Sequence, residues 1–262
     1  MSDVMSKTLW DGRRGLAGFA VGTAAVGAMY AGFYPQVADG AMGQAVQGFS
    51  PGLREALRMD DLASAAGYLG SSVFGIIIPL IAVIYGVSVG TRAIAGDEES
   101  GYLDLLVAHP VSRTCLVLHR FAALAAGGAM IAGVVWLAML AVRPGARLQS
   151  ISPAEFAAQC AALALLTILF GAIALAIGAL TGSRSAALGG SAAVAVLSYA
   201  AHTVAGQIGA DVLQYLSPFH YYIAAEPLRY GFQWPDLGIL AGGTALFLGL
   251  AVAAFNRRDL NS

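Results

Sequence analysis

The chain has 262 residues, of which 58% are hydrophobic and only 29 are Asp, Glu, Lys or Arg. Because a soluble domain carries about a quarter charged residues, this composition indicates a membrane protein. The formal net charge of −1 argues against nucleic-acid binding, and the alternation typical of a transmembrane barrel is missing. Cys115 and Cys160 lie in different segments, so we expect no disulfide.

Six runs of 20 or more residues carry no charge, and a helix needs about 20 residues to cross the hydrocarbon core. The pattern therefore predicts an all-α polytopic membrane protein with six transmembrane helices. These helices are expected at 15–34, 67–91, 119–142, 158–181, 186–208 and 237–256. The fifth gives the weakest prediction, because its run contains Ser191, Ser198, His202 and three glycines.

The first apolar run has 24 residues, longer than the 7–15 typical of a signal peptide, so we expect an uncleaved first helix. Six crossings place both termini on one side. The loops of that side carry nine Lys and Arg residues and the other loops carry five, which puts the termini in the cytoplasm. The Ala-, Gly- and Arg-rich composition favours a bacterial source, and hence the bacterial cytoplasmic membrane.

Two long segments are expected on the outer side. In the loop at 35–66, Ser50 and Pro51 can start a short helix. The segment 209–235 contains seven aromatic residues and three prolines, which predicts short helices that lie in or dip into the outer interface. This segment is either a headgroup-level anchor or an outer gate. The gate residues would be Phe219, Tyr221, Tyr222 and Glu226.

The chain shows no energy source of its own. Its only lysine is Lys7, at the edge of the chain, which excludes a phosphate-binding loop. None of the six runs holds the acid that an ion-driven carrier usually buries at mid-membrane. The one ionisable exception, His202, is either a proton or substrate site or a histidine hydrogen-bonded within the bundle. We expect no metal and no cofactor on this chain. Ion coupling is weakened rather than excluded, and if the chain moves a substrate uphill we expect the energy to come from another subunit.

Three glycine pairs at four-residue spacing favour close helix packing. They are Gly18–Gly22, Gly86–Gly90 and Gly238–Gly242. With 33 glycines in the chain such spacings arise often by chance, so we interpret them as packing sites and only secondarily as a dimer interface.

The segment 92–118, between crossings two and three, concentrates negative charge. Four acids lie within eight residues, namely Asp97, Glu98, Glu99 and Asp104. Burying each in lipid would cost roughly 2.5–3.5 kcal/mol, which forces the segment into water or against protein. A short amphipathic helix is predicted from about Glu98 to Ala108, with acids at its N-terminus, and Pro110 ends it. It either packs on its own bundle or docks on a partner.

The stretch GDEESGYLDLLVAHPVSR, at 96–113, resembles a segment of ABC-2 type transporter permeases: an acid, a small residue, Gly, a Leu-rich turn, then Pro-Val-Ser-Arg. The stretches LSPFHYY at 216–222 and FNRRDL at 255–260 are also similar to that family. The resemblance implies a permease that is not itself an enzyme. Its partners would be a second copy or paralogue, membrane lipid, and separate ATP-binding subunits that use ATP and Mg.

In this family the helix after the second crossing is the coupling helix, which sits in a groove of the ATPase. The implied contacts are Asp97, Glu98, Glu99, Gly101, Tyr102, Leu103, Leu105, Leu106, Pro110 and Arg113. Residues 1–14 would form a connecting helix along the inner leaflet, and 209–235 the paired outer re-entrant helices.

The expected function is export, and the uncharged crossings favour a hydrophobic or amphipathic cargo such as a drug, antibiotic or lipid. Two alternatives stay open at this point. One is an ion-coupled secondary carrier acting alone, and the other is a non-transporting membrane scaffold or membrane enzyme.

Overall fold

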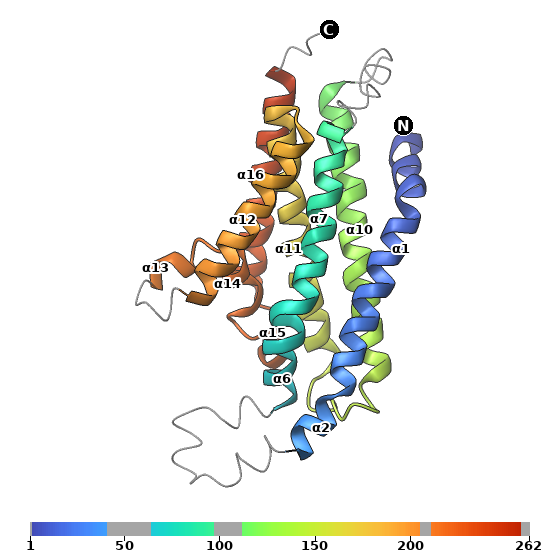
Figure 1. Cartoon of the computed structure of the whole chain (residues 1–262), viewed down its shortest axis with the longest axis vertical. Coiled ribbons are helices and arrows are strands. Elements are labelled where there is room, and N and C mark those ends of the chain that lie inside the picture. The colour runs from blue at the N-terminus through green and yellow to red at the C-terminus, as the bar shows by residue number, and fades with distance from the viewer. Residues whose placement is uncertain (1, 41–63, 97–111, 205–210, 258–262) are drawn as a thin grey trace.

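The computed structural model describes residues 2–40, 64–96, 112–204 and 211–257, and within these ranges every regular element is a helix (Figure 1). Five helices or helix combinations are long and apolar enough to cross a membrane. They are Gly12–Asp39, Ala65–Gly96, Arg113–Val142, Pro153–Thr181 and Trp234–Arg257. The expected all-α polytopic architecture is confirmed.

The long helices run side by side along one axis (Figure 1). They are α1 (Ser2–Gly32), α7 (Ile78–Thr91), α10 (Arg113–Val142), α11 (Pro153–Thr181) and α16 (Trp234–Arg257). The start of α1, the end of α7, the start of α10 and the end of α16 share one end of the bundle, which we call the N/C end. The opposite end is the far end.

The N-terminal region and the first crossing belong to the same helix. Helix α1 is continuous from Ser2 to Gly32, and the short α2 (Tyr34–Asp39) follows it. The predicted helix at 1–14 and the first crossing therefore form one continuous helix. That the start of this helix lies along the inner leaflet stays a prediction. The short helix expected at Ser50 and Pro51 lies outside the described residues.

The second crossing is a composite of α and wider π turns. It consists of α6 (Ala65–Tyr68), η1 (Leu69–Ile77), α7 and η2 (Arg92–Gly96). Ser64 caps its start by accepting a 3.0 Å hydrogen bond from the backbone N–H of Gly67. Pro79 stands in the first turn of α7 and has no N–H to donate, and the π turn directly before it accommodates this gap.

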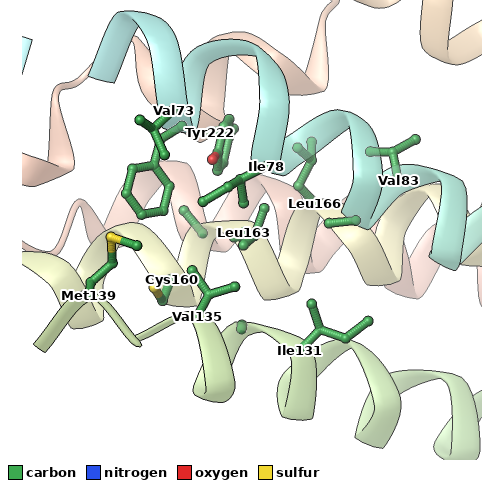
Figure 2. Packing of buried hydrophobic residues seen from close by; sticks show 14 of the residues in the cluster. Val73, Ile78, Val83, Ile131, Val135, Met139, Cys160, Leu163, Leu166 and Tyr222 are labelled. Atoms are coloured by element: carbon green, nitrogen blue, oxygen red, sulfur yellow. The ribbon is translucent and has the colours of Figure 1, made fainter. Parts of the chain in front are cut away.

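Helix α11 is the centre of the bundle, because it packs against α7, α10, α12 and α16. A capping box starts it: Ser152 Oγ accepts from the Glu155 N–H at 3.2 Å, and the Ser152 N–H donates to Glu155 Oε2 at 2.6 Å. Gly182 ends it in the left-handed conformation, with φ 65°. Figure 2 shows Val73, Ile78 and other side chains of the second crossing packing on Leu163 and Leu166 of α11.

The glycine pairs have different roles in the structure. A Cβ at Gly86 or Gly90 would overlap the backbone carbonyl oxygen of Thr167 or Gly171, so α7 and α11 cross backbone to backbone at this pair. At the other two pairs, on α1 and α16, a Cβ would meet no described atom within 4 Å. Among the described residues, therefore, only the α7 pair makes the expected close contact.

The fifth predicted crossing corresponds to α12 (Arg184–Val204), which ends before α13 (Asp211–Gln214), α14 (Pro218–Ile223) and α15 (Pro227–Tyr230). Helix α12 is not among the five spans that length and hydropathy select, and residues 205–208 lie outside the described part. The count of six crossings therefore stays a prediction. In Figure 1, α12 descends from the N/C end and α13 and α14 turn away beside its lower end.

Candidate functional site

Most of the predicted coupling helix cannot be placed, because residues 97–111 lie outside the described part of the chain. Of its implied ATPase contacts only Arg113 is described, and it is the first residue of α10. Ser112 caps this helix by accepting a hydrogen bond of 3.3 Å from the backbone N–H of Cys115. The structure thus shows how both flanks of the predicted coupling segment, η2 and the start of α10, join the bundle.

Arg113 connects the start of α10 to the end of α16. Its guanidinium Nη1 donates to the backbone carbonyl of Phe255 at 3.3 Å and lies over the Phe255 ring, with 5.9 Å from Cζ to the ring centroid. A second bond beside it joins Asn256 Nδ2 to Thr114 Oγ1 at 3.0 Å. Carbonyls in the last turn of a helix have no partner within the helix. The Arg113 guanidinium therefore satisfies one of them, the Phe255 carbonyl.

A small hydrophobic cluster at the N/C end, which we call the N/C core, holds both flanks of the predicted coupling segment. Its buried members come from η2, α10, α11 and α16. They are Ala93, Ile94, Leu116, Val117, Leu175, Ala176, Ala179, Ala251 and Phe255. Close-packed side chains have low compressibility and transmit strain. A displacement of either flank is therefore expected to be passed to α11 and α16.

The predicted gate region is built around α14. Ser217 begins this helix: its Oγ accepts from the Phe219 N–H at 3.2 Å and donates to the Ser198 carbonyl of α12 at 2.7 Å. Phe219 is buried between two rings, Phe170 of α11 at 5.5 Å and Tyr199 of α12 at 5.2 Å. Helix α14 also contacts α16 and η1. The segment is therefore part of the bundle's packing, and α14 lies against four other elements.

The four candidate gate residues fall into two environments. Phe219 and Tyr222 are buried in the bundle, whereas Tyr221 is half-buried and its hydroxyl donates to the Tyr215 carbonyl at 2.8 Å. Glu226 lies apart from them, before α15, in the left-handed conformation with φ 49°. It pairs with Arg229 at 3.2 Å, and Arg229 donates to the capping Ser64 at 3.0 Å. This link ties α15 to the start of the second crossing.

Sequence reasoning missed a polar pair in the core. Gln159 of α11 and Tyr222 of α14 are 1% and 0% exposed, and their polar groups lie close enough to interact with each other. Neither group makes a hydrogen bond of ordinary length and angle among the described residues. Buried polar groups are normally well hydrogen-bonded, so a pair with only this weak interaction marks a place of interest. The signal in the sequence is that Gln159 is the one amide side chain in the charge-free run 156–183.

We expect Tyr222→Phe to change the free energy of unfolding by less than about 0.5 kcal/mol, because it keeps the ring and removes a hydroxyl that makes no well-formed hydrogen bond. Tyr68→Phe is the matched control. Its hydroxyl donates to the Tyr30 carbonyl at 3.1 Å, so its loss should lower the free energy of unfolding by about 1 kcal/mol. Thermal unfolding of the purified proteins in detergent measures both. Equal destabilisation by the two variants would contradict the expectation.

The fold and the packed helix ends define a class, that of polytopic α-helical membrane proteins. A family model described as ABC-2 family transporter protein matches residues 6–260, nearly the whole chain. The chain belongs to the ABC-2 transporter family. A comparison with curated proteins gives no match.

Membership in this family confirms the resemblance found in the motifs and fixes the general role. The chain is the membrane subunit of an ABC transporter, and a separate ATP-binding subunit carries the ATPase activity. The family model spans the described crossings and the segment between α7 and α10 alike.

Proposed function

We propose that this chain, with a second copy or a paralogue, forms a translocation path across the bacterial cytoplasmic membrane and couples to its ATPase through residues 97–113. The observation that carries the proposal is the anchoring of both flanks of this segment in the N/C core. Ile94 precedes the segment and is fully buried, and Arg113 follows it and bonds to Phe255. The N/C end is then the cytoplasmic end.

The same packing suggests how a movement would cross the membrane. ATP-driven closure of the partner ATPases displaces the coupling segment, and the N/C core passes the displacement to α11 and α16. Long helices tilt as rigid bodies, so the far end moves too. There α14 is held between α11, α12, α16 and η1, and relative tilting of these helices would release Phe219 and open the outer side.

The proposed cargo is hydrophobic or amphipathic, because the six charge-free runs place no Asp, Glu, Lys or Arg within the membrane. Export is the direction that membership in the ABC-2 family favours.

The docking claim is tested with Glu99→Arg combined with Leu106→Asp, which reverses a charge and places an acid on the apolar face of the predicted coupling helix. We expect the complex with the ATPase to be lost, and coupled ATP turnover to fall at least about ten-fold, since a buried like-charge contact costs several kcal/mol. Pull-down of the ATPase and ATP hydrolysis in proteoliposomes measure the two effects.

The control is Asp39→Arg, which also turns an acid into an arginine but at the far end. Asp39 pairs there with Arg147 at 2.6 Å, and both side chains are exposed, so its loss costs little. Unchanged binding and turnover in the Glu99 and Leu106 variant would refute docking at this segment.

A further inference from the structure

Two histidines from different helices pack edge to face beside the predicted gate. His202 lies in the last turn of α12 and His220 in α14, and their ring centroids are 6.1 Å apart with an interplanar angle of 67°. The chain has only four histidines, so half of them meet here although 18 residues separate the two along the sequence. Ionisable groups within the apolar part of a membrane protein are costly and mark functional sites.

Both rings keep a nitrogen available for a ligand. The Nδ1 atoms of His202 and His220 are buried, and neither makes a hydrogen bond to the residues that the structure describes. Aromatic rings enclose His220 on its other sides: Tyr215 at 4.7 Å and Tyr221 at 5.2 Å between centroids. The hydroxyl of Tyr221 donates to the carbonyl of Tyr215 rather than to either Nδ1 atom.

The separation of the rings matches two imidazoles on one metal ion. With metal–nitrogen distances of about 2.0–2.1 Å, two bound rings have centroids roughly 5 Å apart at a tetrahedral angle and roughly 6.3 Å apart when collinear. The observed 6.1 Å lies within this interval, near its wide end. A tetrahedral cation would therefore need rotation of the side chains that brings the two rings about 1 Å closer.

We propose that His202 and His220 form a site for a divalent first-row transition-metal cation such as Zn²⁺, which bridges α12 and α14. Neutral imidazole is a preferred ligand of Zn²⁺, Cu²⁺ and Ni²⁺. Among the described residues no group of three or more His, Cys, Asp or Glu side chains could hold a metal ion, so the site has two protein ligands. Water or an external ligand would fill the other positions, which makes the cation exchangeable.

Bridging these helices has a mechanical consequence. Helix α14 is attached to α12 through the Ser217–Ser198 bond and the Phe219–Tyr199 contact, and a metal at the histidines adds a third connection. The bound cation thus holds α14 against α12. The inference concerns metal binding itself and does not depend on the proposed transport function.

The test is Zn²⁺ binding to the purified, tag-free full chain in detergent, measured by isothermal titration calorimetry. We expect one Zn²⁺ per chain with Kd of about 10 µM, and a loss of affinity of at least about ten-fold in His202→Gln and in His220→Gln. Affinity should also fall at acidic pH, because protons compete with the cation for the same imidazole nitrogens.

His119→Gln is the matched control. His119 lies on α10, where its Nδ1 is already 2.7 Å from the Cys115 carbonyl and 3.3 Å from Cys115 Sγ, so its replacement should leave Zn²⁺ binding unchanged. Elution as a single peak in size-exclusion chromatography shows that each variant is folded, and His202→Asn serves as a second variant if His202→Gln is not. Absence of Zn²⁺ binding to the native chain overturns the proposal, as does native affinity in the variant that lacks both histidines.

Discussion

The combined substitution of Gly86→Ala and Gly90→Ala is expected to lower the free energy of unfolding by about 4 kcal/mol. Overpacking costs about 1–3 kcal/mol per site, and the upper value applies because each new methyl group meets a backbone carbonyl that cannot rotate away. Replacing glycine by alanine in a helix returns about 1 kcal/mol at each position. The clash therefore exceeds the gain in helix propensity.

The overlap occurs at the centre of the bundle, which makes it difficult to relieve. The Cβ of Gly86 would approach Thr167 and that of Gly90 would approach Gly171, one helical turn further along α11. Both contacts lie on the same pair of helices, so α7 would have to move away from α11 along its length. Chemical unfolding in mixed micelles measures the loss.

Gly18→Ala with Gly22→Ala is the control, because this pair has the same spacing and faces no described atom within 4 Å. Its stability should equal or exceed that of the native chain. If both double variants lose the same stability, the close α7–α11 crossing is not what holds the bundle together.

Arg113→Met is expected to reduce permease-stimulated ATP turnover about ten-fold while the complex with the ATPase still forms. Methionine keeps the apolar stem of the side chain but removes the guanidinium that bonds to the Phe255 carbonyl. The start of α10 then loses a connection to α16, so movement of the coupling segment is passed on less completely. Turnover in proteoliposomes and pull-down of the ATPase separate the two effects.

This measurement also decides between two roles for Arg113. As a link within the bundle, it affects turnover but not binding. As a direct ATPase contact, which the family resemblance implies, it affects binding, and loss of the complex in Arg113→Met would reject the link. Arg257→Met is the control, because Arg257 is an exposed arginine at the same end, in the last turn of α16, and should tolerate the change.

The long helices could be predicted because a single physical requirement determines them. A helix that crosses the lipid bilayer needs about 20 residues without charged side chains, and such a run can be recognised directly in the sequence. The same criterion is ambiguous for α12, where polar groups lower the hydropathy. Ser191 in this helix satisfies its hydroxyl internally, by donating to the Ala187 carbonyl at 2.5 Å, so the sequence looks more polar than the folded helix is.

The sites were harder to predict because their parts are distant in sequence. Arg113 and Phe255 are 142 residues apart, and no local pattern pairs them. His202 stood out as an isolated ionisable residue, but its neighbour His220 became visible only when α14 was placed beside α12.

The central position of α11 has a consequence for biosynthesis. The ribosome delivers α1, α7 and α10 to the membrane before α11, although α7 and α10 both pack on it. Until the fourth crossing emerges, the Gly86–Gly90 face of α7 has lipid in place of its partner backbone. Helices insert first and associate afterwards, so α1 and α10 can pack early, whereas the packing around α11 waits for the second half of the chain to be translated.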